Sequence, residues 1–238
     1  MNEASKPGPA PQKSTKMPWI IAFSTTLLSA LCVSFAFAPS HAGKRLALLP
    51  LALLYALRGA LGIARFRKRG ELGQILKPHR GDLALGALLA ALLYGIASAV
   101  VLFMSTHFKA QTAWIMRIYL QLGDRSDQDL IWLGAAVFAI AAMEEMTWRG
   151  LLMSALSEVL TPARAMLVCA ALFALAHAPT LVVLSDPFAG PNPLLTAAGF
   201  GCSLVWGFLV LRYKRLTPAL FCHAFFSWAV VEFPIFRP

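Results

Sequence analysis

Three short polar clusters interrupt apolar stretches in the second half of the chain, and all three carry groups that donate or exchange protons. The first, residues 144–149 with the sequence EEMTWR, holds two carboxylates and a guanidinium. The second ends in His177, and the third contains His223 and Ser227. Ionisable groups within membrane-length apolar segments cost roughly 2.5–3.5 kcal/mol each on insertion scales, so they are typically functional. Carboxylates and imidazoles together point to acid–base chemistry.

Helical spacing separates the roles of the two adjacent glutamates. Glu145 and Arg149 are four residues apart on one helix face, with the acid placed N-terminally as the favourable ion pair requires. Glu144 lies about 100° around the same helix, where Trp148 covers its face. A carboxylate beside an indole in a dry setting suits a general base. We therefore predict Glu144 as the base and Glu145 as its structural neighbour. The alternative is a purely structural ion cluster.

Each histidine has a second residue of interest one helical turn away. Phe173 precedes His177 by four residues and can fix its ring, and Pro179 removes a backbone hydrogen bond just beyond. His223 and Ser227 are also four residues apart, so the imidazole and the hydroxyl can point at one developing oxyanion. For each histidine taken alone, hydrogen-bonded packing remains the alternative.

The elements that must position these groups are membrane helices. Of the 238 residues, 58% are hydrophobic and only 13% are charged, which is typical of a polytopic helical membrane protein. The apolar runs lack the two-residue alternation of barrel strands. We predict an all-α fold, a polytopic transmembrane helical bundle of about seven spans. The predicted spans are residues 18–38, 46–64, 83–106, 130–148, 165–184, 194–211 and 217–236.

The net charge of +10 falls mostly between the apolar runs, where it orients a membrane protein and does not indicate nucleic acid. Basic residues gather in 65–80 and 212–215, whereas the loop 185–193 has none. This bias predicts a multi-pass protein of a bacterial inner (plasma) membrane with a cytoplasmic N-terminus. The first span could instead be a cleaved signal sequence. Residues 107–129 are predicted to form an interfacial amphipathic helix or lid, or a plain connector.

The order of the motifs EExxxR, FxxxH and HxxxS, each on a separate predicted membrane helix, resembles the CPBP family of intramembrane proteases. That family groups the type II CAAX prenyl proteases with bacteriocin-processing and Abi-type proteases. The resemblance covers roughly residues 130–228. It implies that Glu144 and His177 activate water and that His223 donates in an oxyanion hole. It assigns Glu145 and Arg149 to supporting contacts.

Ser227 departs from the family pattern, which usually has Asn or Asp at this position. A weaker oxyanion hole, a helping water or a loss of activity all remain open. The resemblance also completes the predicted division of the chain. The three parts are a disordered cytoplasmic tail (1–17), N-terminal membrane helices with the amphipathic connector (18–129), and a CPBP-like catalytic membrane core (130–238).

The resulting prediction is an intramembrane endopeptidase that uses water activated by glutamate and histidine. Its expected partners are the lipid bilayer and a membrane-associated protein or peptide, lipidated or with a C-terminal sorting tail, and no nucleic acid. The alternatives are a non-catalytic scaffold or immunity-type member of the same fold, and a transporter that uses Glu144 as a proton carrier.

No cofactor is predicted. The chain lacks the HExxH and GxGD motifs, and residues 201–204 (GCSL) lack the second glycine of a rhomboid-like GxSG. One zinc ion held by His177, His223 and a glutamate is the alternative, because these ligands match a His₂Glu catalytic site on paper. The four cysteines fall in apolar runs without ligand spacing, so we expect buried thiols and no disulfide.

Overall fold

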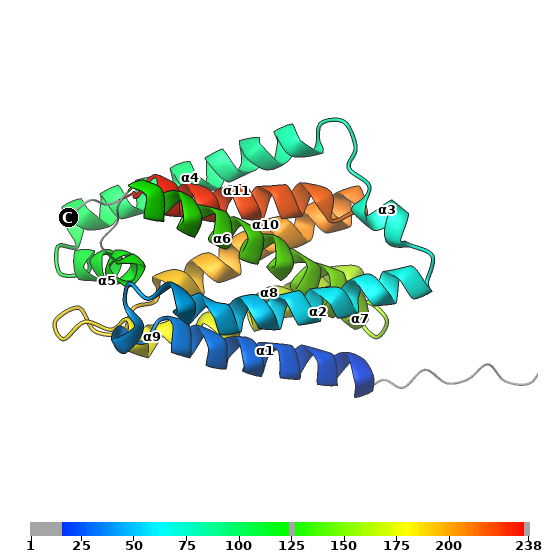
Figure 1. Cartoon of the computed structure of the whole chain (residues 1–238), viewed down its shortest axis with the longest axis horizontal. Coiled ribbons are helices and arrows are strands. Elements are labelled where there is room, and N and C mark those ends of the chain that lie inside the picture. The colour runs from blue at the N-terminus through cyan, green and yellow to red at the C-terminus, as the bar shows by residue number, and fades with distance from the viewer. Residues whose placement is uncertain (1–15, 124–126, 236–238) are drawn as a thin grey trace, which may run out of the picture.

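The computed structural model describes residues 16–123 and 127–235, which fold into a bundle of helices with no β-strand among them (Figure 1). The predicted all-α fold is confirmed. The long helices are α1 (Lys16–Ala36), α2 (Leu49–Lys68), α4 (Asp82–His107), α6 (Asp127–Glu145), α8 (Pro162–His177), α10 (Leu194–Tyr213) and α11 (Thr217–Glu232). The short elements are η1 (Pro39–His41), η2 (Arg45–Leu48), α3 (Leu72–Leu76), α5 (Thr112–Leu122), η3 (Met146–Met153), α7 (Ser154–Leu156) and α9 (Thr180–Val183).

Within the described residues, six helical segments are long and apolar enough to cross a membrane, in place of about seven. They are Lys16–Ala36, Arg45–Lys68, Asp82–His107, Ile131–Leu156, Pro162–Val183 and Leu194–Tyr213. The predicted seventh span forms α11, which has only 16 residues and is about 24 Å long, short of the roughly 30 Å of a bilayer core. It ends before Phe233-Pro234 because a residue that precedes proline avoids helical geometry. α11 nevertheless packs within the bundle against α4 and α6.

The predicted N-terminal tail falls largely on residues 1–15, which lie outside the described residues. Lys16 and Met17, which we placed in the tail, already belong to α1. The predicted boundary is therefore two residues too late.

Glycines set the spacing between several helices. On α2, a Cβ added at Gly59 would lie 3.2 Å from the Met146 Cβ, and one at Gly62 would lie 3.0 Å from the Met146 carbonyl oxygen. On α4, a Cβ at Gly86 would lie 2.5 Å from the Phe221 Cβ of α11. Small residues at helix interfaces allow this close backbone approach in membrane proteins. As a result, α2 is pressed directly onto η3, the segment that follows the two glutamates.

The two ends of the bundle differ in composition. Figure 1 shows α3 and α7 at one end and α5 and α9 at the other. The α3 end carries the basic stretches 65–80 and 212–215, and it is the end that we predict to be cytoplasmic. At the opposite end, the predicted connector forms α5, which is tied to the loop 185–193. The Trp114 indole donates to the Gly190 carbonyl over 3.1 Å, and the Asn192 amide donates to the Trp114 carbonyl over 2.9 Å.

Candidate active site

The first polar cluster lies where an α-helix changes into a π-helix. Glu144 and Glu145 end α6, and the chain continues directly into the π-helix η3, which carries Trp148 and Arg149. All residues of η3 are buried. Single π-helical turns within α-helices are rare and occur frequently at functional sites. The two carboxylates are therefore presented from an irregular turn inside the bundle.

The predicted ion pair between Glu145 and Arg149 is present. Arg149 Nη1 donates to Glu145 Oε1 over 2.7 Å, and neither side chain is exposed. Arg149 Nη2 donates to Ser203 Oγ over 2.6 Å and to the Ser203 carbonyl over 3.0 Å, which ties η3 to α10. Sequence analysis missed Ser203. Paired in this way, the buried guanidinium avoids the large cost of an isolated charge.

His223 of α11 lies between the two glutamates, an arrangement that the sequence did not predict. Its Nδ1 donates to Glu145 Oε1 over 2.9 Å, and its Nε2 lies 3.4 Å from Glu144 Oε2. The indole of Trp206 stacks on the imidazole, with ring centroids 3.6 Å apart and planes 18° apart. Arg149, Glu145, His223 and Glu144 thus form one continuous line of contacts, which we call the charged row.

His177 lies beside the charged row without joining it. Its Nδ1 donates to the Phe173 carbonyl over 2.9 Å, so Nε2 is the nitrogen left to accept a proton. The Phe173 ring lies 4.7 Å from the His177 ring and 6.2 Å from the His223 ring between centroids. It also meets Trp148 edge-on at 5.1 Å. Phe173 therefore packs against both histidines, as the FxxxH spacing indicated for His177.

Ser227 makes no hydrogen bond to the charged row in the part of the chain that the structure describes. It is partly buried one turn after His223, and no hydrogen bond joins it to His223 or to either glutamate. Both ring nitrogens of His223 face carboxylates instead. The predicted pairing of His223 and Ser227 on one oxyanion therefore stays a prediction.

The alternative zinc site stays a prediction. Across residues 16–123 and 127–235, no group of three or more His, Cys, Asp or Glu side chains is placed to hold a metal ion. His177 bonds the Phe173 carbonyl, and the Arg149 guanidinium puts a positive charge against Glu145. The four cysteines are free thiols; Cys169, Cys202 and Cys222 are buried as expected, whereas Cys32 is only partly buried.

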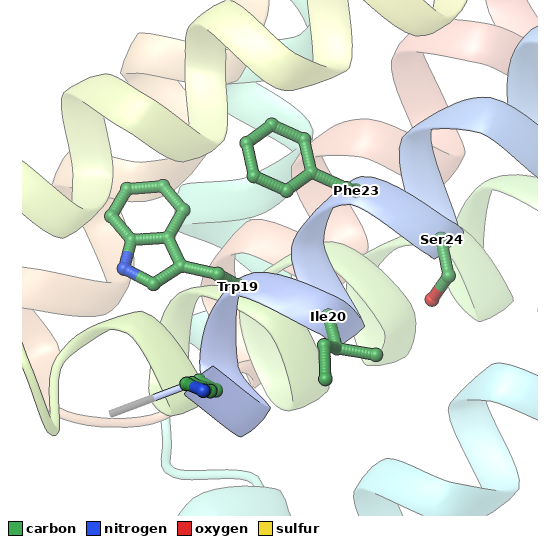
Figure 2. A pocket seen from close by; sticks show the side chains of 5 residues that line it. Trp19, Ile20, Phe23 and Ser24 are labelled. Atoms are coloured by element: carbon green, nitrogen blue, oxygen red, sulfur yellow. The ribbon is translucent and has the colours of Figure 1, made fainter. Parts of the chain in front are cut away.

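Two cavities differ in their relation to the site. One of about 600 Å³ lies on α1 and is lined by Lys16, Trp19, Ile20, Phe23 and Ser24 (Figure 2). Figure 2 shows Trp19 and Phe23 along the same flank of α1, and their ring centroids are 5.8 Å apart. Ile20 and Phe23 are more than half exposed, so this is an apolar surface typical of a lipid-facing helix. A second cavity, about 430 Å³, opens near α3 and reaches Arg149.

Comparison with known proteins agrees with the motif order. Residues 126–229 match the Rce1-like family model, whose description is type II CAAX prenyl endopeptidase Rce1-like. The matched segment contains all three polar clusters. No curated protein and no solved structure matches the chain.

Proposed function

We infer a function from one premise: over residues 126–229 the chain belongs to the CPBP family. The matching family model is that of the Rce1-like type II CAAX prenyl endopeptidases. The chain is accordingly a multi-pass membrane protein of the CAAX-protease type. The proposed activity is the hydrolysis of a peptide bond in a membrane-associated protein or peptide. The observation that carries this proposal is the charged row, which places two carboxylates, an imidazole and a guanidinium in contact inside a membrane bundle.

Glu144 is better placed than Glu145 to act as the base. Glu145 is fully buried, and its Oε1 accepts from both Arg149 and His223. Glu144 retains 8% exposure, and its ion-pair contact with His223 is longer, at 3.4 Å. Glu144 is therefore the less tightly bonded and more exposed of the two carboxylates, which leaves it free to take a proton from water.

The proposed reaction uses Glu144 and His223 of the charged row together with His177. Glu144 takes a proton from water while the water oxygen attacks the peptide carbonyl carbon. The carbonyl oxygen becomes an oxyanion, to which the Nε2–H of His223 donates. The proton then passes from Glu144 to the departing nitrogen as the C–N bond breaks. His177 presents Nε2 as an acceptor that helps to orient the water. The buried setting strengthens each of these hydrogen bonds.

The setting of the reaction follows from the basic end of the bundle. The residues around α3 support an inner-membrane orientation with a cytoplasmic N-terminus. The second cavity then opens towards the cytoplasm. A substrate with a lipidated end or a C-terminal sorting tail would remain in the bilayer while its peptide segment reaches the row.

The test is Glu144→Gln, which keeps the shape of the side chain and removes the base. We expect the turnover of purified protein in lipid vesicles to fall about 10²–10⁴-fold, with thermal stability unchanged. Prenylated and unmodified C-terminal peptides serve as probes, and mass spectrometry identifies the products. The same assay with a chelator tests the metal-free mechanism. Full activity of Glu144→Gln would contradict the assignment, and no cleavage by the unaltered protein would favour the scaffold alternative.

A further inference from the structure

Among the described residues, the buried polar atoms without a hydrogen-bond partner include four on α1, α2 and η3. They are Thr25 Oγ1, Ser29 Oγ, Tyr55 Oη and Trp148 Nε1. All four side chains are fully buried, with exposed fractions of 0%. Unpaired buried polar groups are few in native proteins, and each one requires an explanation such as a catalytic role.

These atoms come from three different elements, and those of Ser29, Tyr55 and Trp148 lie near the proposed base. Thr25 and Ser29 are one turn apart on the inner face of α1, Tyr55 lies on α2, and Trp148 lies on η3. The side chains of Ser29, Trp148 and Glu144 surround the Tyr55 hydroxyl, but none of them forms a hydrogen bond with it in this structure. We call the four residues the Tyr55 cluster.

The backbone holds Tyr55 firmly in this position. Thr147 Oγ1 donates to the Tyr55 carbonyl over 3.2 Å, which ties α2 to η3 immediately beside Trp148. Gly59, one turn after Tyr55, allows the two backbones to approach closely. The phenol ring thus packs in the same apolar core as Trp148. A phenylalanine would fill this space without burying a hydroxyl, so packing alone does not account for the oxygen.

We propose that Tyr55 is a positioning residue for Glu144, with its hydroxyl donating a hydrogen bond to the Glu144 carboxylate. Ser29 faces the phenol oxygen from the α1 side. His223 Nε2 already faces Oε2 of the same carboxylate. A second donor, the Tyr55 hydroxyl, would fix the plane of the Glu144 carboxylate and direct a remaining lone pair at the water. This inference rests on the proposed function. It also goes beyond the family match, because α1 and α2 lie outside residues 126–229.

The experiment removes the single oxygen with Tyr55→Phe and measures kcat, KM and Tm in the same vesicle assay. We expect kcat to fall roughly 10- to 100-fold, with KM unchanged. Tm should change little, because phenylalanine fills the same space and the loss of the proposed hydrogen bond is offset by no longer burying a hydroxyl. Ser29→Ala should lower kcat less and in the same direction. A residue with only a structural role would lower Tm and leave kcat per folded molecule intact.

Tyr94→Phe is the matched control. The Tyr94 hydroxyl donates to the Phe233 carbonyl over 2.7 Å at an exposed position, so this variant loses an observed hydrogen bond away from Glu144. We expect kcat to be unchanged. Unchanged kcat in both Tyr55→Phe and Ser29→Ala would overturn the inference, as would an effect on KM alone. If Glu144→Gln is inactive while Tyr55→Phe is fully active, only this inference fails. If Glu144→Gln is active, the proposed function fails.

Discussion

Two carboxylate–guanidinium pairs in this bundle, one partly buried and one fully buried, differ in how completely their atoms are bonded. At the start of α4, both oxygens of Asp82 are occupied. Oδ1 accepts from Arg215 Nη2 over 2.5 Å, and Oδ2 accepts from Arg215 Nε over 2.9 Å. Oδ2 also accepts from Thr217 Oγ1 over 2.5 Å and from the His79 backbone N–H over 3.0 Å. This cluster joins α4 to the start of α11 and leaves no carboxylate oxygen free.

The charged row is less complete. Glu145 Oε1 accepts two hydrogen bonds, but Glu145 Oε2 and Arg149 Nε have no partner in the described part of the chain. The neighbouring Tyr55 cluster adds further unpaired atoms. A fully bonded buried network stabilises a fold, whereas a partly bonded one is destabilising unless a ligand or reaction uses it. The comparison therefore supports the proposal that the Asp82 cluster is structural and that the charged row is reactive.

Glu145→Gln should have the largest effect on stability. The variant leaves the Arg149 guanidinium, which is 1% exposed, without its charge partner. Removing one member of a buried pair typically costs about 3–5 kcal/mol. We expect a large fall in Tm in detergent and a loss of turnover, in contrast to Glu144→Gln, which should lose turnover alone.

The double variant Glu145→Gln, Arg149→Met provides the control. It removes both charges, so part of the stability should return while activity stays absent. A Glu145→Gln protein as stable as the unaltered protein would show that the pair has no structural role and would weaken the comparison.

Asp82→Asn should have a smaller effect, on stability alone. Arg215 retains 17% side-chain exposure and can reach water when its partner is neutralised. We expect a loss of about 1.5–3 kcal/mol, the usual range for hydrogen bonds to a charged group. Turnover per folded molecule should not change. A fall in kcat with normal Tm would place this cluster in the reaction and remove the distinction between the two networks.

Sequence reasoning found the polar clusters because charges are conspicuous in apolar helices, and because four-residue spacing fixes the Glu145–Arg149 pair locally. It missed the partners of His223, since Glu145 and His223 are 78 positions apart and meet only through the packing of α6 on α11. A helical wheel cannot supply that contact.

Neutral polar residues were harder to recognise than charged ones. Tyr55 and Ser203 each lie in an apolar run and carry no charge to mark them. A usable signal was present for Tyr55, because Gly59 and Gly62 follow on the same helix face and indicate a close helix approach. The span count failed for a similar reason: hydropathy could not show that α11 stops at Glu232.

Position 227 tests whether an added hydrogen-bond donor can find an acceptor beside the incompletely bonded charged row. The resemblance implies an amide or carboxyl side chain where this chain has a hydroxyl, and the structure shows no bond from Ser227 to His223 or the glutamates. An added donor near an incompletely bonded site can find an acceptor in the transition state. The same addition beside Asp82 would find its oxygens already occupied.

Ser227→Asn should therefore preserve or raise turnover, because the longer side chain brings an N–H closer to the oxyanion. Ser227→Ala should cost less than His223→Ala, and less than the roughly 2.7–4 kcal/mol that follows loss of a well-placed oxyanion donor. The measurement is kcat for the three variants in vesicles, corrected for the folded fraction of each. If Ser227→Ala is silent while Ser227→Asn destroys activity, Ser227 is a packing residue of α11. The third motif would then act through His223 alone, whose two ring nitrogens already connect it to both glutamates.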